Sequence, residues 1–170
     1  MKKDTLLIFG SARKDGNTRL MANFLLEKMP NSELLNLHDF DFSGYDYEHK
    51  NAEDDFFKMA EHMLTFDKIV FCTPVYWYSM SSIVKRFLDR WSDLVTIRKE
   101  KGRGLAGKKL FALCCSSDVE EYEGFFMPFE KTAGYLDMVY GGEIHTYVVD
   151  DKIPEEVQNR LLDFCEKIKA

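Results

Sequence analysis

Two short segments of the sequence combine residue types that can bind a phosphate group and a flat ring system. The first, residues 10–18 (GSARKDGNT), follows an apolar run and leads into a stretch with helical periodicity. Glycines let the backbone turn tightly, hydroxyl and amide groups donate hydrogen bonds, and a helix N-terminus adds positive potential. This segment therefore predicts a phosphate site. The alternative is an ordinary strand-to-helix turn capped by Asn17 or Thr18.

The spacing within this segment differs from that of the common nucleotide-binding loops. It reads G-x5-G-N-T, one residue longer than the loop of nucleoside triphosphatases, and it has no Lys-Ser/Thr pair. It also lacks the G-x-G-x-x-G pattern of dinucleotide sites. Hydrolysis of ATP or GTP is therefore disfavoured.

The second segment, residues 73–82 (TPVYWYSMSS), places three consecutive aromatic residues directly after an apolar run. Core packing would space aromatic residues with a period of two or 3.6. A continuous run in a loop instead offers planar faces and backbone amides to a flat, hydrogen-bonding ring system. The alternative is a hydrophobic patch used for association.

Neither segment carries the residues of a hydrolase or a metal site. There is no Ser/His/Asp set, no carboxylate pair and no Cys-x5-Arg loop, because Tyr78 stands where the arginine would follow Cys72. The four cysteines form no C-x-x-C pair and the four histidines lack ligand spacing, so no metal is expected. The cysteines are expected to be buried, reduced thiols; a redox role for the adjacent Cys114 and Cys115 is the alternative. Flavin chemistry needs no acid or base, because the ring itself accepts hydride.

The elements that must position these segments are short strands alternating with helices. Apolar runs predict central strands at 5–9, 69–72 and 110–115, with weaker strands at 34–37 and 144–149. Helical stripes occupy the ranges 20–29, 56–63, 84–91, 126–136 and 157–168. With right-handed crossovers this predicts an α/β fold, a doubly wound five-stranded parallel sheet of order 2-1-3-4-5 with helices on both faces. Such a sheet binds ligands beyond the carboxyl ends of its strands, here after residues 9, 72 and 115.

Together the two segments resemble those of the NAD(P)H-dependent FMN reductase family, and the likeness extends over nearly the whole chain. The resemblance implies a flavodoxin-like fold. It implies an FMN phosphate site made by Ser11, Arg13, Gly16, Asn17 and Thr18. It implies a flavin-ring site lined by Pro74, Val75, Tyr76, Trp77 and Tyr78. After the fourth strand the family often has Thr- and Gly-rich sequence; Ser116 and Ser117 stand there in this chain and can still donate to the ring edge.

The activity that the resemblance implies is an NAD(P)H-dependent FMN reductase or a quinone-reductase-like oxidoreductase. FMN would be the cofactor, NAD(P)H the co-substrate, and a quinone, a free flavin or a nitro or azo aromatic the electron acceptor. The first alternative is a flavodoxin-like electron carrier that binds FMN without using NAD(P)H, and the second is a non-catalytic flavin sensor. Ser11-Ala12-Arg13 and Tyr76-Trp77-Tyr78 resemble reductases more than carriers, so the enzyme is the preferred interpretation.

Composition limits the partners. The chain has 170 residues, 45% hydrophobic, which suits one domain over residues 1–170. A net charge of −6 argues against nucleic acid or an anionic membrane as the partner. The early apolar run is far shorter than a signal-peptide core or a membrane span, so a cytoplasmic protein is expected.

A homodimer is expected around the helix at 84–91. Its apolar stripe faces the sheet, yet Met80, Ile83 and Leu94 also need cover, and one sheet face does not easily bury them all. The resemblance adds that the matching helix of the family, residues 85–90 here, commonly pairs two subunits. The alternative is a monomer in which residues 38–55 cover these side chains. That loop could instead be a lid, and the basic loop at 96–109 could attract phosphates, although solvated connections explain both.

Overall fold

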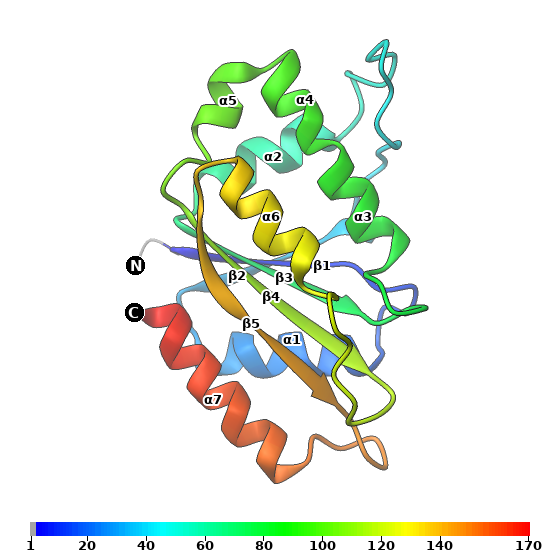
Figure 1. The fold of residues 1–170 in the computed structure, drawn as a ribbon, viewed down its shortest axis with the longest axis vertical. Coiled ribbons are helices and arrows are strands. Elements are labelled where there is room, and N and C mark those ends of the chain that lie inside the picture. The colour runs from blue at the N-terminus through cyan, green and yellow to red at the C-terminus, as the bar shows by residue number, and fades with distance from the viewer. Residues whose placement is uncertain (1–2) are drawn as a thin grey trace.

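Five strands form one parallel sheet in the order β2-β1-β3-β4-β5, in a computed structural model that describes residues 3–170 (Figure 1). The strands are β1 (Thr5–Phe9), β2 (Ser32–Asn36), β3 (Lys68–Pro74), β4 (Lys109–Ser116) and β5 (Val139–Tyr147). Every neighbouring pair in this sheet runs parallel. This is the strand order of flavodoxin-like doubly wound sheets, so the predicted fold class is confirmed.

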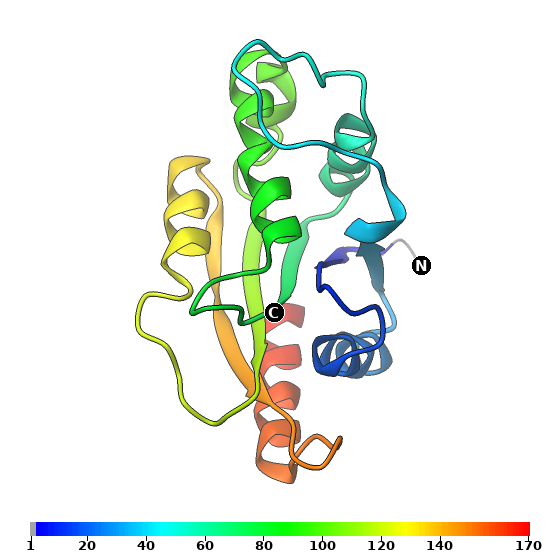
Figure 2. The ribbon, with the colours of Figure 1, turned by 90° about the vertical axis from the view of Figure 1, so that its right-hand side faces the viewer.

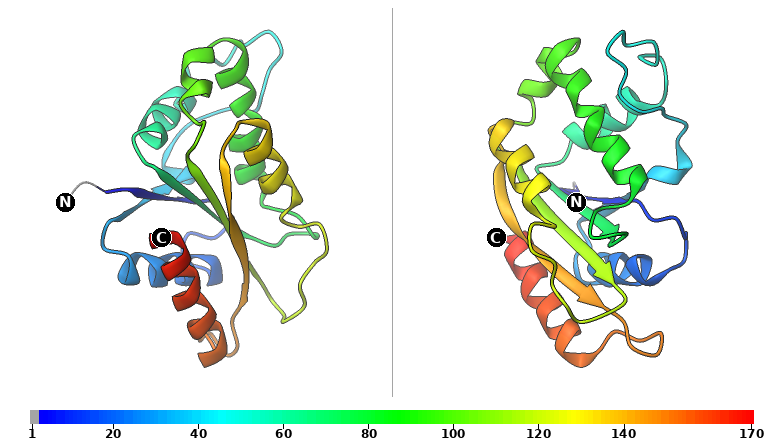
Figure 3. Two further views of the ribbon diagram at one scale, coloured as in Figure 1. Left: turned by 60° about the vertical axis from the view of Figure 1, so that its left-hand side comes forward. Right: turned by 45° about the vertical axis from the view of Figure 1, so that its right-hand side comes forward.

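Helices cover both faces of the sheet, as Figures 2 and 3 show. The helices are α1 (Asn17–Lys28), α2 (Phe56–Leu64), α3 (Ser82–Asp89), α4 (Trp91–Thr96), α5 (Lys99–Arg103), α6 (Met127–Tyr135) and α7 (Glu155–Lys169), with a 3-10 turn η1 (Leu37–Asp39) after β2. One buried cluster joins the sheet to α1 and α7, and the other joins it to α2, α3, α4 and α6. Among residues 3–170, no helix is both long and apolar enough to cross a membrane.

The period-two alternation of the strands divides the apolar side chains between the two clusters. Leu6 and Ile8 belong to the α2 side, whereas Leu7 belongs to the α1 side. The same alternation separates Cys114 and Cys115, which lie in opposite clusters as buried free thiols. Their adjacency in the sequence therefore reflects packing on two faces and gives no reason to expect a bond between them.

Strand β5 begins at Val139, before the predicted range 144–149. Its first half was not predicted, because two glycines interrupt the alternating pattern there. The register shifts next to Phe111, and a Cβ atom at Gly141 would collide with the Phe111 ring. Gly142 has a φ of +118°, which side chains rarely adopt. Both glycines are thus required by a β-bulge, and a bulge breaks the alternation that identifies a strand.

Two of the three side chains behind the dimer expectation, Met80 and Leu94, are buried within one chain, and Ile83 is partly buried. The predicted apolar stripe at 84–91 runs along most of α3 and ends at the first residue of α4. It faces the sheet as expected. Met80 is only 5% exposed and Leu94 is fully buried, so neither calls for a second copy. The homodimer stays a prediction that needs other support.

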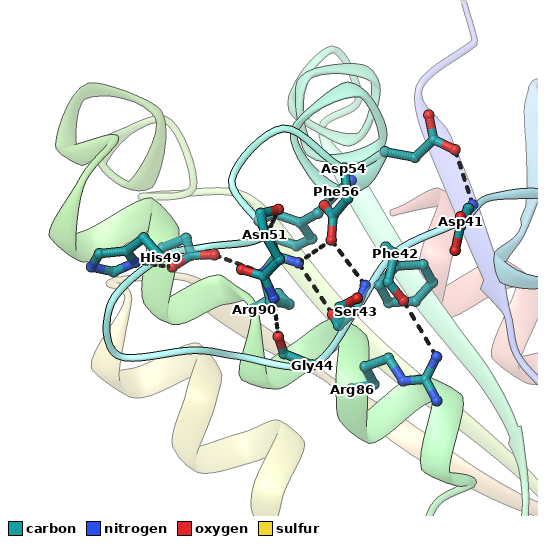
Figure 4. A network of polar contacts seen from close by, with 12 residues as sticks. Asp41, Phe42, Ser43, Gly44, His49, Asn51, Asp54, Phe56, Arg86 and Arg90 are labelled. Atoms are coloured by element: carbon teal, nitrogen blue, oxygen red, sulfur yellow. Dashed lines mark hydrogen bonds and ion pairs between the residues drawn. The ribbon is translucent and has the colours of Figure 1, made fainter.

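The segment 38–55 is anchored along α2, α3 and α4 by Arg90, which is fully buried between α3 and α4 (Figure 4). Its Nη1 donates to the Asp54 carboxylate at 2.6 Å and to the Ser43 carbonyl at 3.1 Å, and its Nε donates to Asp93 at 2.6 Å. The guanidinium also lies 4.6 Å from the ring centroid of Phe56. A buried charge is tolerated only when it is paired and hydrogen-bonded, and these contacts meet that condition. These contacts therefore hold the segment 38–55 in one position beside α2, α3 and α4.

The basic segment at 96–109 lies at the end of the sheet where β4 begins. It contains α5, which was not predicted because four charged residues and a glycine carry no apolar stripe. Lys101 pairs with Glu61 of α2 at 2.7 Å. The segment therefore connects α4 to β4 at the edge opposite the loops that follow β1, β3 and β4.

Candidate functional site

Three loops and the start of α1 enclose a hollow of about 260 Å³ at the carboxyl ends of β1, β3 and β4. Figure 2 faces this side of the molecule, with the loop after β1 in blue and the loops after β3 and β4 in two greens. The lining residues are Ser11, Arg13, Gly16, Asn17, Thr18, Pro74, Val75, Tyr76, Cys115, Ser116 and Ser117. The two segments singled out by residue type are thus brought together with the segment after β4.

The start of α1 offers hydrogen-bond donors to this hollow. Its N-cap is Gly16, which has no side chain to bond the first turn, and the first turn holds no acidic residue. The helix N-terminus therefore keeps its positive potential and its free N–H groups. Thr18 lies in the first turn at 3% exposed, and Arg13 stands exposed on the preceding loop. This donor set suits an anion such as a phosphate.

Two contacts hold the loop after β1 in place, and neither was predicted from the sequence. The His38 ring of η1 lies with Nε2 2.6 Å from the Ser11 carbonyl, which can only accept, so Nε2 donates. The Ser81 hydroxyl at the N-cap of α3 donates to the Gly10 carbonyl at 2.7 Å. Contacts between such distant segments leave no local signal in the sequence.

Gly10 is required by close packing. A Cβ atom there would lie 2.7 Å from a Val84 methyl and 2.8 Å from an Ile83 methyl. The glycine therefore lets α3 approach the end of β1, which brings the aromatic segment beside the loop after β1.

The aromatic segment forms a tight turn whose tip is strained. Tyr76 and Ser79 exchange two backbone hydrogen bonds of 2.9 and 3.1 Å, so Trp77 and Tyr78 are the two central residues. Their φ angles of 49° and 63° match a type I′ turn, which usually takes Asn and Gly. Non-glycine residues in this region cost on the order of 1–3 kcal/mol each and cluster at functional sites.

The turn divides the predicted ring contacts into two groups. Pro74, Val75 and Tyr76 line the hollow. Trp77 and Tyr78 lie outside its lining in the described structure, 93% and 69% exposed at the tip. The tip residues thus stand at the rim of the site.

Cys115 lines the hollow but was not among the predicted site residues. It is the residue of β4 just before Ser116 and is 4% exposed. Burial raises the pKa of its thiol to about 11, so the thiol is protonated near neutral pH. Its contribution is an apolar wall. Its place at the carboxyl end of the predicted strand 110–115 was the signal that could have found it.

The sequence matches the NADPH-dependent FMN reductase family over residues 4–146. The chain belongs to this family. YwqN of Bacillus subtilis (strain 168), named as a candidate NAD(P)H-dependent FMN-containing oxidoreductase, is 25% identical over 154 residues, covering 81% of each chain.

Two solved structures are similar to this FMN reductase family member in fold. The Trp repressor binding protein from Bacillus subtilis superposes with a TM-score of 0.73 at 21% identity and covers 98% of both chains. An NADPH-quinone reductase from P. pentosaceus superposes with a TM-score of 0.69 at 20% identity and covers 96% of both chains.

The hollow has the donors and the wall that the family's FMN cofactor requires. Gly16 leaves the first turn of α1 uncapped beside Arg13, which suits the phosphate end. The Pro74, Val75 and Tyr76 wall and the buried Cys115 suit the apolar ring end. The residues present therefore fit FMN.

Proposed function

We propose that the protein is an FMN-dependent NAD(P)H oxidoreductase whose electron acceptor is a small molecule, such as a quinone, a free flavin or a nitro or azo aromatic compound. When bound, FMN supplies the hydride chemistry, so the protein needs no acid, base or nucleophile of its own. The protein binds FMN, orients it and leaves one side of the flavin ring accessible to the nicotinamide and the acceptor.

The observation that carries this proposal is the meeting of an uncapped helix N-terminus and a largely apolar wall, formed by Pro74, Val75 and Tyr76, in one hollow. Arg13, Asn17 and Thr18 are proposed to bind the phosphate, together with Ser11 and the backbone of Gly16. Pro74, Val75 and Tyr76 are proposed to line the ring from one side. Ser117 is exposed at the opposite edge of the hollow and is proposed to contact the ring there.

Trp77 and Tyr78 are proposed to border the space where nicotinamide and acceptor bind in turn. Their exposure and strained backbone support this role, since exposed aromatic side chains offer stacking surfaces to flat substrates. We also propose a homodimer in which these tips approach the partner subunit. The compartment we propose is the cytoplasm, because four buried free thiols are typical of a reducing environment.

Anaerobic mixing of the FMN-loaded protein with NADPH and, separately, with NADH tests the function. Rapid loss of the flavin absorbance near 450 nm is expected with at least one nucleotide, followed by recovery when a quinone is added. Bound FMN that neither nucleotide reduces would contradict the enzyme and support the electron carrier or the sensor.

A further inference from the structure

A buried histidine lies directly behind the part of the hollow formed by the loop after β4. His145 of β5 is 2% exposed, and its Nε2 lies 2.7 Å from the hydroxyl of Ser116, the last residue of β4. Ser116 lines the hollow, whereas His145 lies behind it. Any influence of His145 on a ligand therefore passes through Ser116.

The hydrogen bonds around Ser116 fix the direction of this contact. The Ser116 hydroxyl donates its single proton to the Asp118 carbonyl at 2.7 Å, because a carbonyl can only accept. The hydroxyl must then accept from His145, so Nε2 carries a proton. The Asp118 backbone N–H also donates to it at 3.4 Å. With its proton and lone pairs engaged, the Ser116 hydroxyl has no donor left for a flavin ring, and it serves to shape the loop.

The same loop is tied to the aromatic turn. The Tyr122 hydroxyl donates to the Asp118 carboxylate, at 2.8 and 3.0 Å from its two oxygens. The Tyr122 ring lies edge-on to the Tyr78 ring, with 5.2 Å between centroids. A continuous set of contacts thus runs from His145 through Ser116, Asp118 and Tyr122 to the turn on the other side of the hollow.

The surroundings favour the neutral form of His145. Burial lowers the pKa of the ring, and the nearby Arg160 charge on α7 lowers it further, while Glu121 and Asp118 act in the opposite direction. Arg160 also donates to the His145 carbonyl at 3.0 Å and pairs with Glu121 at 3.2 Å. A second proton on Nδ1 would be buried without an acceptor, since this atom has no partner within the described residues.

We propose that His145 is a positioning residue: its Nε2–H holds Ser116 and thereby fixes the loop after β4 against the ring end of the FMN site. This rests on the proposed function, because it takes the hollow to be the FMN site. The loop then has one defined shape before the cofactor binds, which spares the binding step the entropy of ordering it.

Titration of the apoprotein with FMN, followed by quenching of FMN fluorescence, tests this role. His145→Leu should weaken FMN binding about tenfold, because the loop loses one buried hydrogen bond. His145→Gln should restore affinity to within about threefold, because its side-chain amide can donate from a similar position. The half-buried His62 of α2, which pairs with Glu33 far from the hollow, gives a control: His62→Leu should leave FMN affinity unchanged.

A riboflavin titration separates this effect from a disturbed phosphate site. Riboflavin lacks the phosphate, so His145→Leu should weaken riboflavin and FMN by the same factor. If His145→Leu does not fold, Ser116→Ala removes the same hydrogen bond from the other side, together with the two contacts to Asp118, and should weaken FMN binding at least as much. In the Ser116→Ala background, His145→Leu should weaken FMN binding little further, because two residues that act through one contact are not additive.

The outcomes distinguish this inference from the proposed function. Unaltered protein that binds no FMN would contradict the function. Unaltered protein that binds FMN, with His145→Leu or Ser116→Ala binding it equally well, would overturn only the role of His145. Failure of His145→Gln to recover affinity, or additive effects of the two substitutions, would overturn it as well.

Discussion

Arg13 and Thr18 are the side chains on which the phosphate end of the site depends most. Arg13 offers a charge-assisted donor and Thr18 a hydroxyl in the first turn of a helix that has no side-chain cap. We expect Arg13→Ala and Thr18→Ala each to weaken FMN binding by roughly 1–3 kcal/mol, while the fold is retained. Fluorescence titration of the apoproteins measures this.

The neighbouring Lys14 provides a matched control for Arg13. It is exposed on the same loop, but it does not belong to the lining of the hollow in residues 3–170. Lys14→Ala should therefore change FMN affinity little, and riboflavin affinity should be insensitive to all three substitutions. Unchanged FMN affinity in both the Arg13 and Thr18 variants would show that the phosphate binds elsewhere.

Residue types in two segments were enough to predict most of the hollow, because each of those segments follows a strand at the same sheet edge. The residues that support the hollow could not be predicted. The ring Nε2 atoms of His38 and His145 each form a hydrogen bond with a segment distant in the sequence, at 2.6 and 2.7 Å. Trp77 and Tyr78 were predicted as ring contacts, but a type I′ turn formed without Asn or Gly places them at the rim.

At the scale of elements, the continuous apolar runs predicted β1, β3 and β4 because strands covered on both faces need apolar side chains on both sides. The predicted strand at 34–37 overlaps β2, Ser32–Asn36. The strand ends before residue 37, because Asn36 already caps η1. The start of β5 and the short α5 were missed, because a glycine bulge and a polar turn have no periodic signal. The anchoring of 38–55 was not predicted, because it depends on the buried Arg90 and a charged side chain is ordinarily expected to be exposed.

Arg90 makes the segment 38–55 part of the folded core, and its removal should destabilise the protein. Arg90→Met would leave Asp54 without its ion-pair partner and the buried Asp93 with only His49, which costs about 3–5 kcal/mol. Lys85→Met on the preceding helix α3 breaks only the exposed pair with Asp89 and should cost less than about 1 kcal/mol. Urea unfolding measures both, and equal stability of the two variants would contradict the anchoring role.

The same network predicts how stability changes with pH. Burial raises the pKa of Asp54, but hydrogen bonds from Arg90, Ser43 and Phe56 and the Arg90 charge lower it by more, so the net shift is downward. A lowered pKa in the folded state stabilises the protein above the ordinary value near 4, and this stabilisation is lost as the pH falls through the lowered value. The free energy of unfolding should thus fall below about pH 4. The fall should be shallower in Asp54→Asn, and an identical pH profile would contradict the assignment.

At the scale of the whole molecule, the proposed homodimer depends on surface that one chain leaves uncovered. Trp77 and Tyr78 at the rim and Tyr135 of α6 are among the exposed large side chains available for such a contact. Sedimentation at micromolar concentration should give about twice the chain mass of 19.9 kDa. A mass near that of one chain would refute the dimer and favour the monomer in which 38–55 covers α3.

The proposed function depends most directly on the hollow at the carboxyl ends of β1, β3 and β4 being an FMN site. A monophosphate fits a loop closed by Gly16, Asn17 and Thr18, whereas the adenosine pyrophosphate of FAD lacks its usual G-x-G-x-x-G fingerprint here. The most direct test is mass spectrometry of the flavin released from the purified protein, after saturation with an equimolar mixture of FMN and FAD at micromolar concentration and removal of the excess. We expect FMN as the released cofactor. Release of FAD, or of no flavin at all, would contradict it.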